Sequence, residues 1–493
     1  MEITLERKTQ RDGRPVYQQI ADQIREAVAA RRLEAGMRLP PIRELAKRLG
    51  VNRDTVAVAY EVLARSGLVK STVGRGTFVT DPPPPALPPP FEPVLSSLTE
   101  RLLVLERSRP RFGSAVDAVP MHALIPDPSL YPTDAFRKSL NRAILAGGPE
   151  LFLYGGPQGH PHMREVLAKR LCSSGVQVSP DELVLCHGAS QGIGLALRLF
   201  AEPGDLIAVE EPTYNNVLAT SSALGLQTVP VPMREEGPDL AALERALKRP
   251  EVKLLYTIPT FHNPLGTTTS VSHRRALLAV AARCGKPVIE DAYEADLGFD
   301  GTPVPPLTAF DDAGIVVHLS SFSKSLFPGV RVGAVAAHGR LVDALTVLKQ
   351  ATDLSDAMPL QAALAEFVES GEYDRHLRRM RRVLRGRRDA LLEALDEHLP
   401  EGSRWTRPDG GYQVWVELPL GIDTSELLPD AVAAGVLFAP GAQFHHDGRP
   451  SNALRLTFAQ ADEAALRRGV KILGDVIRRR GAGTPRRMNR VHI

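Results

Sequence analysis

The segment SSFSKSLFPGVRVG, residues Ser320 to Gly333, decides how the larger part of this chain is interpreted. It places one lysine, Lys324, among hydroxyl side chains, and Arg331 follows a short distance later. A lysine that links covalently to a phosphorylated aldehyde needs such neighbours, because the Ser321 hydroxyl and the Arg331 guanidinium can hold a dianionic phosphate. The segment therefore favours a covalent lysine beside a phosphate site over the alternative, a surface lysine in a serine-rich loop.

The length and composition of the chain narrow the classes of protein it can be. With 493 residues it is too long for one hydrophobic core, so we expect at least two domains. A hydrophobic content of 43% and a charged content of 24% are typical of a soluble globular protein. Neither a run of about 18 apolar residues nor an apolar signal sequence is present, so we expect no membrane partner. The cysteines Cys172, Cys186 and Cys284 lack the paired spacing of a disulfide framework or zinc site, and we expect a reduced cytoplasmic protein without a metal.

Positive charge is concentrated at the N-terminal end. Residues 1–80 hold 15 Lys and Arg against 9 Asp and Glu, a net charge of +6, whereas the whole chain carries +3. A basic segment on a slightly acidic body indicates that the segment, and not the body, meets a polyanion. Many solvated helices are also basic, so this charge carries weight only together with a motif.

Proline marks the boundary between two parts of the chain. The segment DPPPPALPPPFEP, Asp81 to Pro93, has eight prolines in thirteen residues. This density excludes a helix or a central strand and favours an extended polyproline II spacer. We expect a linker over residues 81–120, which also contains an amphipathic stretch from Val94 to Arg107.

After the linker, long helical patterns alternate with short apolar runs. Four of these runs predict buried strands, at 206–210, 253–259, 287–291 and 315–321. Strands that alternate with helices indicate a mostly parallel sheet with crossover helices. Two later runs, 411–419 and 452–458, predict strands of a smaller α+β part, and we expect a basic, disordered tail over 479–493.

The basic segment has the pattern of a winged helix-turn-helix. Apolar side chains recur at helical spacing over three stretches, 16–30, 41–49 and 53–66. Gly50 to Asn52 forms the turn before the third stretch, and Asn52 suits the N-cap of that helix. LVKSTVGRGTFVT, residues 68–80, then predicts two short strands around a Gly-Arg-Gly tip. The second helix of such a pair enters the major groove of DNA.

The segment RLPPIRELAKRLGVNRDTVAVAYEVLARSGLV, with the wing GRGTFV, resembles the GntR family of transcription regulators over nearly all of residues 14–80. The resemblance implies that double-stranded DNA is a partner. It also implies that certain residues face the DNA, namely Arg43, Asn52, Arg53 and Thr55 in the helices and Arg75 and Gly76 in the wing. The alternative is that these residues are only solvated surface. Many such contacts go to phosphates and select no base sequence.

Further segments supply groups that suit the covalent lysine. VIEDAYEADLGF brings Asp291 and Tyr293 to the end of a buried strand, and a carboxylate beside a pyridine nitrogen keeps that nitrogen protonated. TIPTFHNPLGTT offers Asn263, whose amide can donate to a phenolic oxygen. Each has a structural alternative: Asp291 could cap a helix or form an ion pair, and Asn-Pro-Leu-Gly could be only a turn.

A second group of segments suits a phosphate, a ring and a carboxylate. CHGASQGIGLAL opens a helix at Ala189, Ser190 and Gln191, where free N–H groups favour a phosphate. Tyr214 can stack on a ring, although core packing explains it equally well. Arg455, in NALRLTFA, can hold a carboxylate bidentately, and the alternative is a surface ion pair.

Taken in order along the chain, these residues resemble fold-type I aminotransferases over about residues 121–478; the matching positions are Tyr154, Ser190, Tyr214, Asn263, Asp291, Lys324, Arg331 and Arg455. With the GntR-like segment, the whole chain resembles the MocR subfamily. The resemblance implies an α/β protein: a winged helix-turn-helix over 1–80, then a fold-type I, aminotransferase-like domain with a mostly parallel central sheet.

The resemblance also implies a function. Pyridoxal 5'-phosphate would be the cofactor, with Lys324 and Tyr293 as catalytic residues and Arg455 as the effector site. The protein would be a transcription regulator that senses an amino compound or vitamin B6 through aldimine chemistry at Lys324. It would act as a head-to-tail homodimer in which Tyr154 serves the partner's cofactor. The alternative is an active aminotransferase that carries a DNA-binding head.

Two positions depart from the family pattern. ALIPDPSLYP has Leu124 where relatives usually have glycine, which would narrow the substrate pocket. Asn215 and Asn216 follow Tyr214 where some relatives carry an arginine, which weakens the expectation of an effector with a second acidic group.

Overall fold

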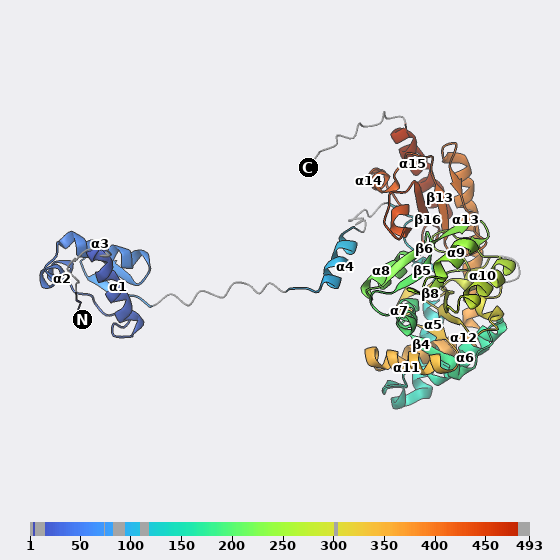
Figure 1. Ribbon diagram of the computed structural model, residues 1–493, viewed down its shortest axis with the longest axis horizontal. Helices are drawn as coiled ribbons and strands as arrows, with labels where there is room; N and C mark the ends of the chain where they lie inside the picture. The colour runs from blue at the N-terminus through green and yellow to red at the C-terminus, as the bar shows by residue number, and fades with distance from the viewer. Residues whose placement is uncertain are drawn as a thin grey trace. The chain divides into compact units, whose positions relative to one another are not determined.

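The computed structural model describes residues 3–4, 15–72, 74–81, 94–108, 118–299 and 304–481. The chain divides into two compact units, Met1–Val94 and Leu95–Ile493 (Figure 1). The proline-rich spacer predicted for 81–93 lies almost wholly outside the described residues.

The first unit contains the predicted winged helix-turn-helix. Its helices are α1 (Val16–Ala29), α2 (Ile42–Leu49) and α3 (Arg53–Arg65), and its wing is the antiparallel pair β1 (Val69–Thr72) and β2 (Gly76–Val79). The apolar faces predicted from the spacing meet in one core, which includes Ile20, Ile24, Leu45, Val56 and Leu63. This unit therefore has a hydrophobic core of its own.

Local chemistry fixes the turn between α2 and α3. Gly50 ends α2 with a φ of 63°, a left-handed conformation that favours glycine. Asn52 is the N-cap of α3, as predicted, because its side chain accepts a hydrogen bond from the Asp54 backbone N–H at 3.1 Å.

The second unit is built on an eight-stranded sheet in the order β4-β11-β10-β9-β8-β5-β6-β7. Pairing is parallel from β10 to β6 and antiparallel at β11 and β7. The four predicted strands are confirmed as β5, β8, β9 and β10. The bounds are β4 Leu183–Cys186, β5 Leu206–Glu211, β6 Gln227–Arg234, β7 Gly237–Pro238, β8 Val252–Thr257, β9 Val288–Asp291, β10 Val316–Ser321 and β11 Gly333–Ala336.

Helices cover both faces of this sheet. On one face, α7 (Ala189–Phe200), α8 (Asn215–Ala223) and α11 (Arg340–Asp353) pack on alternate strand residues. On the other, α6 (Pro161–Ser173), α9 (Leu240–Leu247) and α10 (Val271–Arg283) pack on the intervening residues. Since parallel strands end at the same edge, the segments after β8, β9 and β10 meet there.

A smaller α+β part follows, as predicted. Its sheet has the order β12-β13-β16-β15, and β14 pairs separately with β3. These elements are β3 Val119–Pro120, β12 Arg404–Trp405, β13 Gln413–Glu417, β14 Val436–Leu437, β15 Ala439–Pro440, β16 Ala453–Thr457, α13 Glu372–His398, α14 Thr424–Ala434 and α15 Glu463–Gly481.

The C-terminal helix corrects one prediction. α15 continues to Gly481, so residues 479–481, which we predicted as part of a disordered tail, are helical. Arg480 ties this last turn to α14, with its Nε 2.9 Å from Asp430 Oδ2. Residues 482–493 lie outside the described part of the chain.

The remaining helices are α4 (Ser97–Ser108), α5 (Thr133–Gly147) and α12 (Met358–Glu369). The amphipathic stretch predicted from Val94 to Arg107 is confirmed as α4, which lies against α8. No described helix combines the length and apolar character needed to cross a membrane.

Arg274 holds the loop that carries Asn263. It is fully buried at the start of α10 and donates to the carbonyl oxygens of Thr269, Pro305 and Pro259, at 2.9, 3.1 and 2.8 Å. Its Nη1 lies 3.9 Å from Glu290 Oε1. One guanidinium thus satisfies several backbone groups that would otherwise be buried unpaired.

We predict that Arg274→Gln lowers the free energy of unfolding by about 3 to 5 kcal/mol, because it leaves several buried carbonyl oxygens without their donor and removes the cation 3.9 Å from the buried Glu290 carboxylate. Urea unfolding, followed by the fluorescence of Trp405 and Trp415, measures the loss. Arg275→Gln is the matched control, since Arg275 is exposed and only contacts the Phe310 ring, at 4.4 Å. It should cost less than about 1 kcal/mol. Equal losses of stability in the two variants would contradict the structural role that we give to Arg274.

Candidate functional site

Lys324 lies at the carboxyl edge of the sheet, directly after β10. Its Nζ donates to the Leu124 carbonyl oxygen at 2.5 Å, and its own carbonyl oxygen accepts from the Tyr412 hydroxyl at 2.5 Å. Burial lowers the pKa of this amine from its ordinary value, and Arg455 and Arg331 lower it further, although Glu294 raises it. An amine that loses its proton more readily is a better nucleophile.

Asp291 ends β9 and is almost fully buried at the same edge of the sheet. Its Oδ2 accepts a hydrogen bond from the Tyr256 hydroxyl at 2.7 Å, whereas its Oδ1 is buried without a partner in the described part of the chain. Burial raises the pKa of this carboxyl from 3.8 to about 6. An orphaned acceptor in the interior calls for a donor, and a protonated ring nitrogen is one.

Arg455 and Asn263 hold each other across the two parts of the second unit. Arg455, on β16, donates from Nη1 to Asn263 Oδ1 at 3.0 Å and from Nη2 to the His122 carbonyl oxygen at 2.7 Å. Its Nε is buried with no partner among the described residues. Burial lowers the pKa of Arg455 to about 10. The guanidinium stays charged, so the site has a fixed cation that could meet a carboxylate.

Two tyrosines flank the site. The rings of Tyr214 and Tyr293 are parallel, with centroids 6.3 Å apart and an interplanar angle of 6°. The Tyr293 hydroxyl accepts from Gln413 Nε2 at 2.9 Å, which leaves its own proton available for another acceptor. Burial raises the pKa of Tyr293, so the phenol keeps that proton.

The candidate phosphate cradle, formed by Gly188, Ala189, Ser190 and Arg331, lies where β4 turns into α7. Gly188 has a φ of 76° and allows the Arg331 guanidinium to approach, since a methyl group there would stand 3.0 Å from Arg331 Nη1. Arg331 donates from Nη2 to the His187 carbonyl oxygen. α7 begins at Ala189, followed by Ser190, and the first N–H groups of a helix favour an anion.

Serines complete this cradle. Ser321 Oγ accepts from the Ser323 backbone N–H at 3.2 Å, so its own proton can be donated elsewhere. Ser323 Oγ is buried and lacks a partner within the described ranges.

Two residues predicted for the cofactor site, Gln191 and Tyr154, have side chains that lie away from it. Gln191 Oε1 accepts from the His187 N–H at 2.7 Å and Nε2 donates to Asp353 Oδ2 at 2.5 Å, so its side chain is committed away from the cradle. Tyr154 is 87% exposed, on the loop after Gly148–Phe152.

The sequence interpretation missed Tyr256 and Glu294. Tyr256 was missed because its partner, Asp291, lies on the neighbouring strand, and only the register of the parallel pair reveals the contact. Glu294 directly follows Tyr293, but nothing in the sequence shows that this carboxylate is fully buried.

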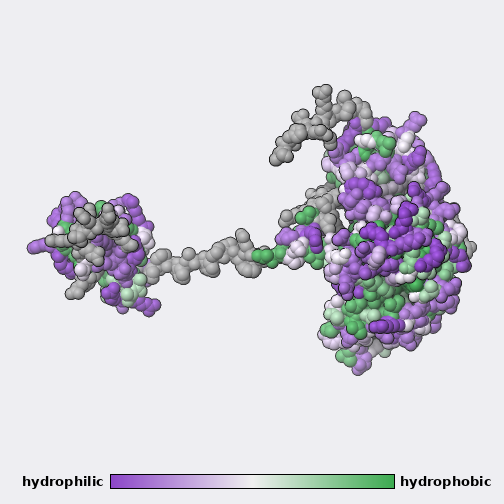
Figure 2. Space-filling view, in the orientation of Figure 1, coloured by the Kyte–Doolittle hydropathy of each residue, from purple (hydrophilic) through white to green (hydrophobic). Residues whose placement is uncertain are grey.

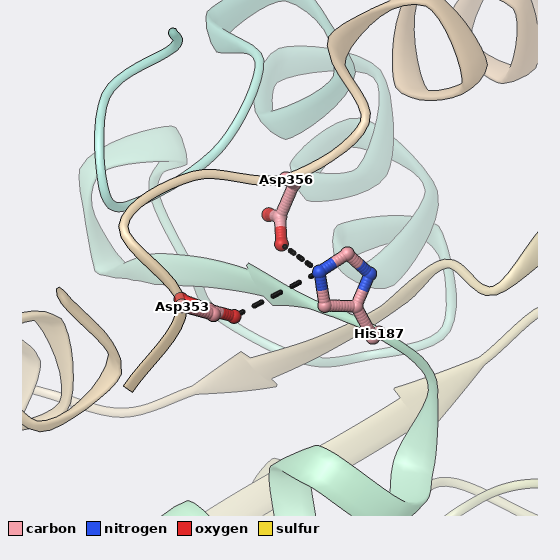
Figure 3. A group of neighbouring side chains, drawn as sticks. All are labelled: His187, Asp353 and Asp356. Atoms are coloured by element: carbon pink, nitrogen blue, oxygen red, sulfur yellow. Dashed lines mark ion pairs between the residues drawn. The ribbon is translucent and has the colours of Figure 1, made fainter. Parts of the chain in front are cut away.

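An acidic cluster lies behind the cradle. Figure 3 shows the His187 ring facing Asp353 and Asp356, and its Nε2 lies 3.8 and 3.3 Å from their oxygens. Lys349 Nζ is 3.5 Å from Asp353 Oδ1 and 3.1 Å from Asp356 Oδ1. The buried ammonium therefore supplies the positive charge that a metal would bring. A second group of possible metal ligands consists of Glu211, His446 and Asp447. There Arg449 supplies the positive charge, because its Nη2 lies 2.9 Å from Glu211 Oε1.

A second candidate surface lies on the first unit. Arg43, Asn52 and Arg53 are exposed at the starts of α2 and α3, and Arg75 is exposed at the wing tip. Thr55 is half-buried. Gly76, with a φ of 111°, lies against Arg38, and a methyl group there would stand 2.6 Å from Arg38 Nε. The exposed arginines leave this surface basic at both the helix and the wing, as a DNA backbone requires.

The buried charge of Asp291 gives a pH-dependent prediction for the cofactor-free protein. Because its pKa is about 6 in the fold and 3.8 ordinarily, the folded protein retains a proton that the unfolded chain loses between these values. The contribution of this retained proton to the free energy of unfolding is complete below about pH 4 and is lost as the pH rises through 6. Asp291→Asn should therefore be more stable than wild type above pH 6 and equal to it below about pH 4.

Urea unfolding across this pH range measures the difference. Asp312→Asn removes an exposed carboxylate and controls for net charge. An Asp291→Asn protein that is less stable than wild type at pH 7.5 would contradict the burial argument.

Comparisons with known proteins agree with this geometry. The family described as aminotransferase class I and II matches residues 127–473, and the family of bacterial regulatory proteins, gntR family, matches residues 16–79. The unpaired Asp291 Oδ1, the N–H groups of α7 and Lys324 fit the ring nitrogen, phosphate and aldehyde of pyridoxal phosphate. Pyridoxal phosphate is therefore the cofactor of this unit.

Individual relatives extend the likeness to the whole chain. The chain is 32% identical to the uncharacterized HTH-type transcriptional regulator YdcR of Escherichia coli, over 94% of this chain and 99% of that protein. It is 29% identical to the probable rhizopine catabolism regulatory protein MocR of Rhizobium meliloti, over 93% of each.

A solved structure matches the second unit. It is LysN, the α-aminoadipate aminotransferase of Thermus thermophilus complexed with N-(5'-phosphopyridoxyl)-L-leucine, with a TM-score of 0.69 and 32% identity. The match covers 78% of this chain and 95% of that one. The chain therefore belongs to the MocR subfamily of GntR-type regulators, in which a gntR-family unit is joined to an aminotransferase class I and II domain.

Proposed function

We propose that this protein is a pyridoxal-phosphate-dependent transcription regulator that senses an amino compound through Lys324. The observation that carries the proposal is that one chain contains two units. The first is a winged helix-turn-helix with an exposed basic surface, and the second has a buried lysine surrounded by side chains that suit a cofactor. The regulators YdcR and MocR align along almost the whole chain, whereas LysN aligns with 78% of it.

Each cofactor group has a residue to meet it. When bound, pyridoxal phosphate supplies an aldehyde that links to a lysine amine and a ring that withdraws electrons. Lys324 would provide the amine, and Asp291 Oδ1 would accept a hydrogen bond from the protonated ring nitrogen. Tyr293 and the Asn263 amide donate to the phenolic oxygen, while Tyr214 stacks on the ring. Ser190, Ser321 and Arg331 hold the phosphate.

The effector would be an amine that also carries a carboxylate. Its amine would displace Lys324, and its carboxylate would pair with Arg455, a buried cation whose Nε lacks a partner among the described residues. Lys324 Nζ donates to the Leu124 carbonyl oxygen, so the Leu124 backbone lies at the lysine site. Because relatives usually have glycine at this position, we expect the larger residue to favour a small effector.

DNA would be bound through α3 and the wing. Arg53 and Arg75 would contact phosphates, and Arg43 and Thr55 would lie nearest the groove. Asn52 uses its carbonyl to cap α3 and keeps its amide for a contact. A regulator works where the DNA is held, so the cytoplasmic location expected from the sequence remains part of the proposal.

The effector would act by shifting an equilibrium. It can change DNA affinity only as far as it binds the two arrangements of the protein differently. Replacing Lys324 by the effector amine changes the contacts around Leu124, Tyr293 and Arg455, which come from three separate parts of the second unit.

We predict that Lys324→Ala abolishes the visible absorbance of the bound cofactor but leaves DNA affinity at the level of the cofactor-free wild type. Fluorescence anisotropy with DNA from upstream of the protein's own gene measures the affinity. Arg53→Ala should weaken it about tenfold or more. Arg65→Ala is the matched control, since Arg65 lies at the far end of α3 and pairs with Glu61 at 2.7 Å.

Two results would contradict this proposal. One is loss of DNA binding in a folded Lys324→Ala protein. The other is rapid multiple turnover with an amino acid and a keto acid, which would favour the alternative of an active aminotransferase, because the site residues are the same in both readings.

A homodimer would complete the cofactor site. Exposed apolar side chains gather around the Tyr154 loop and α11, and Figure 2 shows green surface low on the second unit, near the α5 and α11 labels of Figure 1. They are Leu145, Phe152, Leu153, Tyr154, Val347 and Leu354. So many exposed apolar groups indicate an interface. A head-to-tail partner would bring its Tyr154 to this subunit's phosphate.

Subunit mixing tests this arrangement. We predict that Lys324→Ala and Tyr154→Ala homodimers both bind the cofactor poorly, whereas a refolded mixture regains up to one intact site per mixed dimer. The Tyr154→Ala subunit then supplies Lys324, and the Lys324→Ala subunit supplies Tyr154. Titration of the cofactor absorbance measures the recovery. If the mixture binds only the average of the amounts of cofactor that the two parent homodimers bind, the idea of a site shared between subunits is contradicted.

A further inference from the structure

One buried hydrogen bond holds the carboxylate that the proposed function assigns to the ring nitrogen. Tyr256 lies in β8, Asp291 ends the neighbouring strand β9, and both side chains are almost fully buried. The Tyr256 hydroxyl donates to Asp291 Oδ2 at 2.7 Å. The register of the parallel strands sets this contact, since Tyr256 is opposite Ile289, two residues before Asp291. The proposed function gives Tyr256 no part.

Tyr256 is the donor in this hydrogen bond and Asp291 the acceptor. Burial raises the pKa of the Tyr256 phenol well above its ordinary value, and the charge of Asp291 raises it further, so the hydroxyl keeps its proton. Burial also raises the pKa of Asp291 to about 6, whereas the Tyr256 hydrogen bond and the Tyr293 backbone N–H oppose that rise. A hydrogen bond to the charged form of an acid favours that form.

Two other charged groups near Asp291 are held by partners of their own. Glu210, which raises the pKa of Asp291, accepts from the Ile258 backbone N–H at 2.9 Å. His318, which lowers it, has its Nδ1 2.9 Å from Glu290 Oε2. Both act on Asp291 only through their charge, whereas the Tyr256 hydroxyl bonds to the carboxylate directly.

The same hydrogen bond decides which oxygen of the carboxylate remains open. Since Tyr256 occupies Oδ2, Asp291 Oδ1 is the oxygen that is buried without a partner among the described residues. A side chain that is fixed by a supporting hydrogen bond presents its remaining atoms in a defined direction. The open oxygen is therefore set in place before any cofactor binds.

We propose that Tyr256 is a positioning residue for the cofactor: it fixes Asp291 with Oδ1 open to the ring nitrogen and keeps that carboxylate ionised, so that the proton stays on the ring. The alternative is transfer of this proton to Oδ1, which leaves the ring and the acid neutral. A protonated ring withdraws electrons better than a neutral one. The proposal rests on the contact of Asp291 with the ring nitrogen in the proposed function, and it does not depend on DNA binding.

Nitrogen NMR of the protein, loaded with pyridoxal phosphate that is isotopically labelled at its ring nitrogen, tests the proposal. The chemical shift of this nitrogen distinguishes a protonated ring from a neutral one. Tyr256→Phe keeps the aromatic ring of the side chain and removes the donor. The signal should then move from the protonated toward the neutral position, because a carboxylate without its donor holds a proton more tightly.

Matched variants separate this effect from a general loss of structure. Tyr373 is also a fully buried tyrosine that donates to a carboxylate, at 2.7 Å from Asp296 Oδ2, and Tyr373→Phe should leave the signal unchanged. Asp291→Asn gives the position of the neutral ring. If Tyr256→Phe does not fold, para-aminophenylalanine at position 256 keeps a weaker donor, and its signal should lie between those of wild type and Asp291→Asn.

The proposal is overturned if the folded Tyr256 variants keep the wild-type signal, if Tyr373→Phe moves it as far, or if the wild-type ring is already neutral. A merely structural role of Tyr256 would lower stability and leave the signal in place. Failure of the proposed function looks different, because Asp291→Asn would then also leave a protonated ring signal unchanged. A shift in Asp291→Asn without one in the Tyr256 variants would overturn only the role of Tyr256.

Discussion

The burial of opposite charges at one edge of the parallel sheet is the constraint on which the rest of the second unit depends. Asp291, Glu294, Lys324 and Arg455 come from separate segments, and all of them are wholly or largely withdrawn from water. Each would be costly to bury alone. They are tolerated because burial shifts the pKa of each group toward its neutral form, because Asn263 and the His122 carbonyl oxygen accept hydrogen bonds from Arg455, and because some of their atoms are kept for a cofactor.

This arrangement trades stability for function. Asp291 Oδ1, Ser323 Oγ and Arg455 Nε are buried without partners among the described residues. In a protein selected only for stability, such atoms would be satisfied or absent. Here they mark the places where a ring nitrogen, a phosphate and a carboxylate are expected to bind. The cofactor then contributes to the stability of the fold, since it binds the folded chain and not the unfolded one.

The phosphate cradle and the Tyr154 loop share one supporting segment. Asp353 and Asp356 contact His187 at the cradle, and Ser355 Oγ accepts from the Gly155 N–H at 2.9 Å. The residues that shape one subunit's phosphate site thus also position the loop that would reach a partner. The first unit is different, because its own hydrophobic core and the Asn52 cap build the DNA-facing surface without help from the sheet.

The sequence by itself determined the local structure and the order of the chemistry. Helical spacing, the Asn52 cap and the Gly-Arg-Gly tip specified the winged helix-turn-helix, and short apolar runs specified β5, β8, β9 and β10. These signals depend on residues that are close together in the chain, so they can be recognised from the sequence alone. Lys324, Asp291 and Arg455 were found in the same way, from motifs in a known order.

Only the tertiary structure decided which groups are buried, paired or left open. The Tyr256 contact depends on the register of β8 against β9, and the isolation of Glu294 depends on Gly411, far away in the sequence. The side chain of Gln191 turns to Asp353 because α11 brings that carboxylate to it, and α15 runs past residue 479, where Arg480 pairs with Asp430 of α14. Burial and electrostatics depend on distances between remote segments, and those distances exist only once the chain has folded.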